Sequence, residues 1–207
     1  MYSVATSNGM PIDIFSTLFN PSQYAKQQFQ KVLNSSDYQG ILYFYASYQV
    51  QNAMAVSRAV YNNQYPYQFI HYDRYVIYNP NFMKHMEFTS GNEFVTLSIF
   101  AHELGHHFYA HTDNPNQILK HPWDKEAEAD YYSGFVLAKL QATPKDLEQS
   151  QRLLFTTWSS MTHPDSYKRI SSIIKGWKDG GGIGIAEDNL QNIYNKINNE
   201  LNRWDVT

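Results

Sequence analysis

The chain has 207 residues, of which 43% are hydrophobic, and this is enough for one domain with a core of its own. A formal net charge of −3, without any run of basic residues, argues against a nucleic-acid-binding surface or an anchor on anionic membranes. No stretch approaches ~18 consecutive apolar residues, so we expect no membrane span. Because cysteine is absent, disulfides and thiolate metal ligands are excluded.

The sequence leaves the compartment open. The first four residues, Met-Tyr-Ser-Val, lack a basic segment followed by an apolar one, so a signal peptide is either absent or already removed. The lack of cysteine fits either redox compartment. We slightly favour an exported protein, periplasmic or extracellular, over a cytoplasmic one.

The N-terminal quarter predicts one helix. Residues 1–20 show no regular pattern. An Asn-Pro pair then predicts the start of a helix over 21–34, with the Asn as cap and the Pro in the first turn. We expect Phe29 and either Val32 or Leu33 to face inward from this helix.

The next part of the chain predicts a sheet. The run Ile-Leu-Tyr-Phe-Tyr at 41–45 is ambiguous between helix and strand. Segments rich in aromatic and β-branched residues predict a small, mostly antiparallel sheet over 50–78, with a turn-rich link over 61–66.

The remainder of the chain predicts helices. A Ser-Gly-Asn-Glu segment with the spacing of a capping box predicts the start of the first, and Pro residues predict the starts of the next three. The last helix is amphipathic. The expected ranges are 90–111, 122–140, 143–160, 163–178 and 186–203. We therefore expect a single domain over 1–207, with its core at about 50–177, an N-terminal helical segment and a C-terminal amphipathic helix.

The most specific motif is His-Glu-Leu-Gly-His at 102–106. Because an α-helix turns once per 3.6 residues, His102 and His106 lie one above the other on one face. Two imidazoles so placed can bind one Zn²⁺. Glu103 follows the first of them and can act as general base on a metal-bound water.

Two histidines leave a zinc site short of a ligand, and the candidates are the later carboxylates and the other histidines. Glu126 and Asp130 share one helix face at i and i+4. We predict Glu126 as the third ligand, and Asp130 as a hydrogen-bond acceptor that fixes the tautomer of a ligand imidazole. Glu128 is expected to point the opposite way, toward solvent, as one of the acids that stabilise a helix start.

The other histidines receive no metal role. His107 and His111 lie on a different helix face from His106, so we expect them to be surface or packing residues. His71, His85 and His121 stay unassigned.

These motifs resemble those of the gluzincin metallopeptidases of the CAAX-prenyl-protease and HtpX-like family. Besides the ligand pattern, His-Pro-Asp-Ser-Tyr-Lys-Arg-Ile at 163–170 is similar to the family's H-P-x-x-x-x-R-I segment. The segment Asn52, Ala53, Met54, Ala55 is similar to its Asn-Ala-x-Ala edge strand. The chain lacks the family's membrane helices, so it looks like the minigluzincin form. The resemblance covers about residues 50–177.

The resemblance implies an α+β, zincin-like (minigluzincin) metalloprotease domain, mostly helical, with a small β-sheet beside the active-site helix. It also implies that His163 and Arg169 line the site and hold the substrate or the developing oxyanion. The expected activity is that of a zinc metalloendopeptidase that binds one Zn²⁺ per chain and takes a peptide or protein substrate in extended conformation beside residues 52–56. Two alternatives stay open: a non-catalytic module stabilised by zinc, and a zinc hydrolase of a non-peptide bond.

Overall fold

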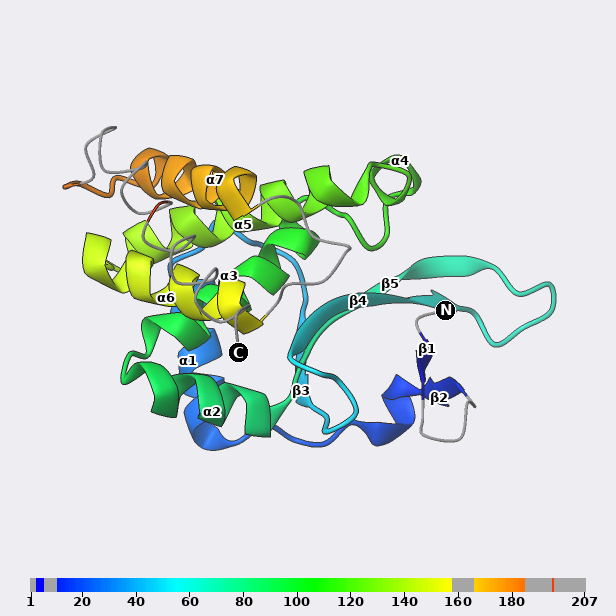
Figure 1. Cartoon of the computed structure of the whole chain (residues 1–207). Helices are drawn as coiled ribbons and strands as arrows, with labels where there is room; N and C mark the ends of the chain where they lie inside the picture. The colour runs from blue at the N-terminus through cyan, green and yellow to red at the C-terminus, as the bar shows by residue number, and fades with distance from the viewer. Residues whose placement is uncertain (1–2, 6–10, 158–165, 185–194, 196–207) are drawn as a thin grey trace.

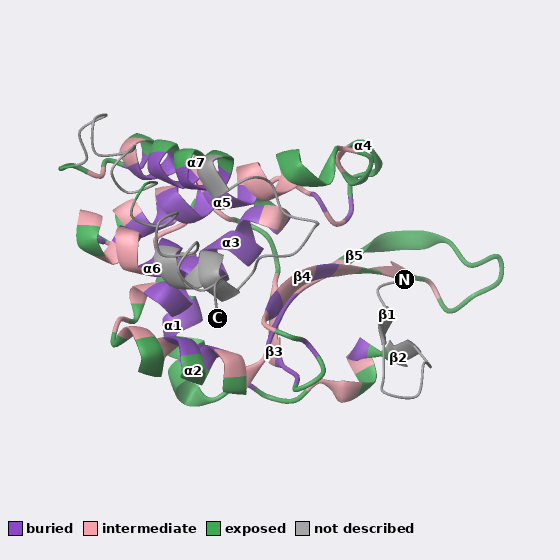
Figure 2. Cartoon of the chain, viewed as in Figure 1, coloured by how far each residue is buried: buried purple, intermediate pink, exposed green. Residues whose placement is uncertain are grey.

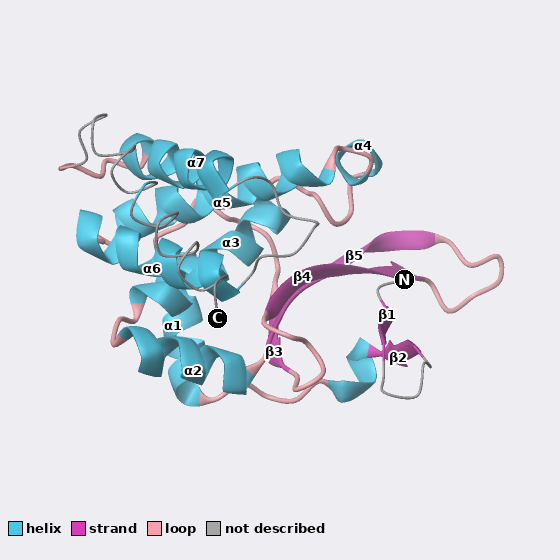
Figure 3. Cartoon of the chain, viewed as in Figure 1, coloured by secondary structure: helices cyan, strands magenta, loops and turns pink. Residues whose placement is uncertain are grey.

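The computed structural model of the chain describes residues 3–5, 11–157, 166–184 and 195. Within them the fold is α+β, with seven α-helices, one short 3-10 helix, a three-stranded sheet and a two-stranded sheet (Figures 1 and 3). In chain order the elements are β1 (Ser3–Ala5), β2 (Pro11–Asp13), η1 (Ile14–Thr17), α1 (Gln23–Asn34), β3 (Tyr43–Ala46), β4 (Ala53–Tyr61), β5 (Phe69–Tyr78), α2 (Pro80–Ser90), α3 (Phe94–Phe108), α4 (Pro115–Ile118), α5 (Pro122–Lys139), α6 (Pro144–Thr157) and α7 (Ser166–Asp179). None of the helices in these ranges is long and apolar enough to cross a bilayer.

The three-stranded sheet has the order β3-β5-β4. Strands β4 and β5 pair antiparallel, with Ala53 opposite Tyr78, as expected for this part of the chain. The ambiguous run before them forms β3, which pairs parallel with β5. Strand β4 therefore lies at an edge of the sheet, and its far half extends with β5 away from the helices (Figure 1).

Helix α3 is the centre of the core. Nearly all of its residues are buried (Figure 2), because it packs against α5, α6, α1 and the sheet. Phe100 is fully buried and meets the rings of Phe29, Phe44 and Tyr78 edge-on, at centroid distances of 5.6, 5.2 and 5.6 Å. Burial of Phe29 and Val32 confirms the predicted inward face of α1.

The start of α3 differs from the expectation. The predicted capping box is wrong, because Ser90 is the last residue of α2 and its hydroxyl donates to the Met86 carbonyl, while Glu93 precedes α3 without a side-chain cap. Helix α2 itself was not expected. It starts where Asn79 accepts hydrogen bonds from the first backbone amides of the helix, with Pro at the first position.

The end of α3 also differs, and this difference moves a histidine. The helix ends at Phe108 rather than near 111, and Ala110 has a left-handed φ of 55°. The backbone N–H of Ala110 bonds the carbonyl of His107, and that of His111 bonds the carbonyl of His106, which is a Schellman motif. The turn brings His111 back toward the helix instead of continuing the i, i+4 spacing.

Helix α5 packs closely on both of its neighbours. A Cβ added to Gly105 of α3 would lie 3.0 Å from the Cα of Ala129. On the other side, a Cβ on Gly134 or Gly176 would overlap with the backbone carbonyl of Ile173 or Tyr131. Glycine at these positions therefore allows the close approach of α3, α5 and α7 seen in Figure 1.

The other predicted helices are confirmed apart from their ends. The predicted helix over 186–203 lies outside the described residues apart from residue 195, and so do residues 163–165 at the predicted start of α7. The short helix α4 and the elements within the first 20 residues were not expected.

Candidate metal site

Three side chains from α3 and α5 converge on one point. They are His102 and His106 from successive turns of α3 and Glu126 from the first half of α5, and they form a group that could hold a metal ion. Nε2 of His102 lies 3.3 Å from Nε2 of His106 and 3.3 Å from Oε2 of Glu126. Nε2 of His106 lies 3.6 Å from Oε1 of Glu126.

These separations fit one cation. Two ligands of a tetrahedral Zn²⁺ at bond lengths of about 2.0–2.1 Å lie about 3.3–3.4 Å apart. The three donor atoms thus form a triangle of the size of one tetrahedral face. The donor set, two imidazoles and one carboxylate, leaves a fourth position for water or substrate in such a geometry.

Asp130 lies behind His102, as predicted. Its Oδ1 is 2.9 Å from Nδ1 of His102, so the imidazole donates from Nδ1 and its Nε2 is the atom that faces the other two donors. Arg169 of α7 donates from Nε and Nη2 to the same carboxylate, at 2.7 and 2.8 Å. Arg169 is only 3% exposed. Arg169 therefore holds Asp130 in place, and its predicted contact with substrate stays a prediction.

The two histidines differ in charge. Burial and the neighbouring His102 lower the pKa of His106 to about 3, so its imidazole is neutral with a lone pair available. Burial opposes a charge on His102, but hydrogen bonds to Asp130 and Glu126 raise its pKa to about 10. Metal binding at Nε2 of His102 therefore displaces a proton.

Glu103 lies beside the donors, buried on the inner side of the cleft. Burial raises its pKa to about 7, against the opposing effect of His102. The backbone of Ala55 in β4, which lines the same cleft, acts to lower this pKa. A carboxylate with a pKa near neutrality can both accept and return a proton.

His106 has a partner that the sequence did not predict. Its Nδ1 lies 3.0 Å from Nδ1 of His111, and Nε2 of His111 lies 2.8 Å from Oε2 of Glu128. Glu128 also bonds Lys120. The expectations that Glu128 points to solvent alone and that His111 has no role near the ligands are both corrected, since the turn at Ala110 brings His111 between them.

A cleft of about 360 Å³ opens onto the donors. Its walls come from β4, α3, the turn after α3, and α5, and include the four predicted edge-strand residues. The lining residues are Asn52, Ala53, Met54, Ala55, His102, Glu103, His106, His111, Thr112, Pro122, Lys125 and Glu126.

The remaining histidines among the described residues lie away from the donors. His107 is buried and donates from Nε2 to the carbonyl of Tyr75, so it is a packing residue. His71 is exposed and pairs with Asp73. His121 caps α5, and His85 is exposed on α2. The predicted site residue His163 lies outside the described residues.

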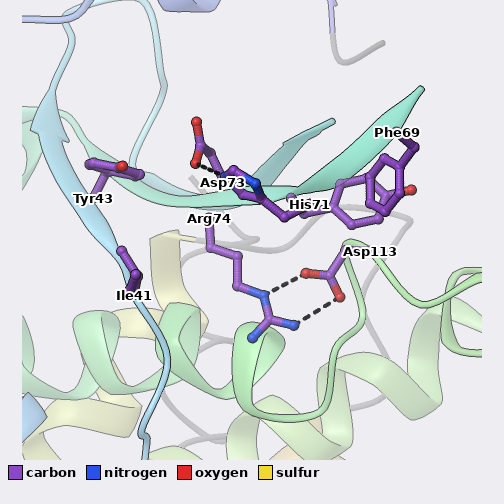
Figure 4. A pocket seen from close by; sticks show the side chains of 8 residues that line it. Ile41, Tyr43, Phe69, His71, Asp73, Arg74 and Asp113 are labelled. Carbon is purple, nitrogen blue, oxygen red and sulfur yellow. Dashed lines mark hydrogen bonds and ion pairs between the residues drawn. The ribbon is translucent and has the colours of Figure 1, made fainter. Parts of the chain in front are cut away.

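A larger cavity of about 540 Å³ is lined by residues of β5, by Tyr43 at the start of β3 and Ile41 just before it, and by Asp113 in the loop after α3 (Figure 4). Its charged centre is a bidentate pair, in which Nε and Nη2 of Arg74 lie 2.5 and 3.1 Å from the Asp113 carboxylate. The pair ties β5 to the loop after α3, which also carries His111. We assign the pair this anchoring role.

Comparison with protein-family models, with curated proteins and with solved structures found no match to this chain.

Proposed function

We propose that this chain is a zinc-dependent metalloendopeptidase with a zincin-like fold of the minigluzincin type. The observation that carries the proposal is the triangle of His102, His106 and Glu126 donors with Glu103 beside it. Several transition metals that bind imidazole and carboxylate would fit these donors. A set of three protein ligands is typical of catalytic zinc.

In this proposal the ion, when bound, supplies Lewis acidity that polarises the scissile carbonyl and makes a water acidic near neutral pH. Glu103 accepts the water's proton on its carboxylate and passes it to the leaving amine. Its pKa of about 7 supports this double role. Asp130 and Arg169 hold the His102 ring, and the cleft wall of α5 excludes bulk water from one side.

The substrate class follows from β4. This strand lies at an edge of the sheet, and Ala53, Met54 and Ala55 at its start line the cleft that opens onto the donors. An extended peptide can pair with the backbone of this strand by β-addition, which would place its backbone across the metal. Peptides and unstructured proteins are therefore the proposed substrates.

The two rival functions predict different behaviour. A structural zinc module needs a closed site with a fourth protein ligand and no use for Glu103. A hydrolase of non-peptide bonds keeps the metal and Glu103 but does not cleave protein.

The test combines metal analysis and proteolysis. We expect about one zinc per chain in the purified protein and cleavage of casein or a quenched peptide. Glu103→Gln should keep zinc and fold but lose nearly all turnover, because an amide cannot take a proton from water at neutral pH. His106→Ala should lose the zinc itself. Bound zinc without cleavage of any peptide would reject the peptidase, and the absence of tight metal would reject the whole site.

A further inference from the structure

The two metal-binding histidines have partners of different kinds on their Nδ1 atoms. His102 meets a carboxylate directly. His106 meets a second imidazole, that of His111, and only beyond it a carboxylate, that of Glu128. Glu128 is bonded in turn to Lys120 in the segment before α5.

The direction of these hydrogen bonds follows from metal ligation. If Nε2 of His106 gives its lone pair to a cation, its proton sits on Nδ1, and Nδ1 donates. His111 then accepts at Nδ1 and keeps its own proton on Nε2. That proton is donated to Glu128 over 2.8 Å. Each N–H in this series has one acceptor, so one tautomer of each histidine satisfies all the hydrogen bonds of His106, His111 and Glu128.

The fold holds the middle residue of this hydrogen-bonded series, His111, in a fixed position. His111 is 3% exposed and fixed by the backbone turn at Ala110, with its N–H bonded to the carbonyl of His106. Its ring also stacks on Tyr109, at a centroid distance of 5.7 Å. The imidazole has therefore little freedom to leave Nδ1 of His106.

We propose that His111 and Glu128 are positioning residues for the metal, and that they orient and polarise His106 as Asp130 and Arg169 do for His102. This inference rests on the proposed metal site. It adds that the second ligand depends on a His–Glu pair reaching from the turn after α3 to α5, with Lys120 holding the far end.

The test measures metal affinity with a competing chelator, independently of catalysis. His111→Leu removes both the acceptor and the donor and should weaken zinc or cobalt binding roughly 10–100-fold, the effect typical of such outer partners. His111→Gln offers a carbonyl and an amide in place of the two ring nitrogens and should recover much of the loss. Glu128→Ala should weaken binding in the same sense.

The double variant distinguishes a connected chain from two unrelated structural effects. Because both substitutions break one chain, His111→Leu with Glu128→Ala should lose hardly more affinity than His111→Leu alone. Independent effects would multiply. Asp124→Asn, an exposed carboxylate on the same helix, and His85→Leu, an exposed histidine, serve as controls and should leave affinity unchanged.

A spectroscopic signature completes the test. In the zinc-loaded protein the Nδ1 proton of His106 should be protected from solvent exchange, and this protection should vanish in folded His111→Leu and persist in Asp124→Asn. Wild-type protein without metal would reject the proposed site. Wild-type protein with metal, but with equal affinity and equal protection in folded His111→Leu, would reject only the inference.

Discussion

Behind the candidate metal donors lies a buried pair of opposite charge, and its burial has an energetic consequence. Asp130 and Arg169 are both almost completely buried and bind each other through two hydrogen bonds. Positive charge from Arg169 and hydrogen bonds from Arg169 and His102 keep the pKa of Asp130 below its usual value, although burial acts to raise it. Removal of Arg169 takes two hydrogen bonds and a positive charge away from a carboxylate that stays buried.

Arg169→Met should therefore destabilise the protein strongly, by about 3–5 kcal/mol, in urea unfolding of the chelator-treated protein. The neighbouring pair of Lys168 with Asp124 is about half exposed on both sides. Lys168→Met should cost no more than about 1 kcal/mol. Equal losses of unfolding free energy in the two variants would show that burial does not make the Asp130 pair more important for stability than an exposed pair.

His107 makes stability depend on pH. Burial lowers its pKa to about 4, against an ordinary value near 6.5. As pH falls from about 6.5 to 4, the unfolded chain takes up a proton that the folded chain does not, so folded-state stability is lost across this window. The loss amounts to at most about 3 kcal/mol.

The measurement is the unfolding free energy of wild type and His107→Gln between pH 7.5 and 4.5, with a chelator present. The glutamine keeps a donor for the Tyr75 carbonyl but does not titrate. We expect the wild-type curve to fall more steeply with acid. Parallel curves would mean that His107 is not held neutral by the fold.

At the scale of elements, two helices end in the same way without glycine. Ala110 after α3 and Gln141 after α5 have φ of 55° and 61°. Both sit in Schellman turns, since Ala142 bonds the carbonyl of Leu137 as His111 bonds that of His106. A side chain in this left-handed region costs roughly 1 kcal/mol relative to glycine.

Ala110→Gly and Gln141→Gly should each raise the unfolding free energy by about 0.5–1 kcal/mol, because relief of strain exceeds the added freedom of the unfolded chain. Thermal melts of chelated protein would show this as a higher midpoint. Ala138→Gly, at a position of α5 with helical backbone, should instead lower it. A lower midpoint for the first two variants would contradict the left-handed turns.

The contact of α5 with α7 depends on two glycines that face each other's helix. A methyl group at Gly176 would overlap with the Tyr131 carbonyl, and backbone cannot turn aside as a side chain does. Gly176→Ala should therefore cost at least about 1–3 kcal/mol and, by moving α7, weaken the hold of Arg169 on Asp130. Gly181→Ala, where nothing lies within 4 Å but φ is 93°, tests strain without a clash. A neutral Gly176→Ala would contradict the close approach of the helices.

Across the whole molecule, the sequence correctly predicted those features that depend on residues close together in the chain. Helical spacing placed His102 with His106, and Glu126 with Asp130, and Pro residues marked helix starts. The parallel pairing of β3 depends on a partner strand about 30 residues away, which periodicity does not reveal.

The misses near the site have equally specific causes. His111 was placed by extending α3 through Ala110, and an alanine in a left-handed turn gives no sequence signal. The contact of Arg169 with Asp130 was not predicted, because it arises from the packing of α7 on α5. A glycine or asparagine at position 110 would have signalled the end of α3 and so the position of His111. The contact of Arg169 with Asp130 can be seen only in the tertiary structure.

The position of the donors on two successive long helices also has a consequence for chain entropy. Glu126 follows His102 by 24 residues, so a bound ion would act as a cross-link that closes a short loop. Such an ion binds only the folded arrangement, and at a concentration 1,000 times its dissociation constant it would add about 4 kcal/mol to folded-state stability. The ion would stabilise the packing of α3 against α5 directly, because both helices carry its ligands. The far end of the β4–β5 hairpin, with Tyr65 and Tyr67 exposed, can open without separating the three donors, so we expect the ion to leave its local opening unchanged.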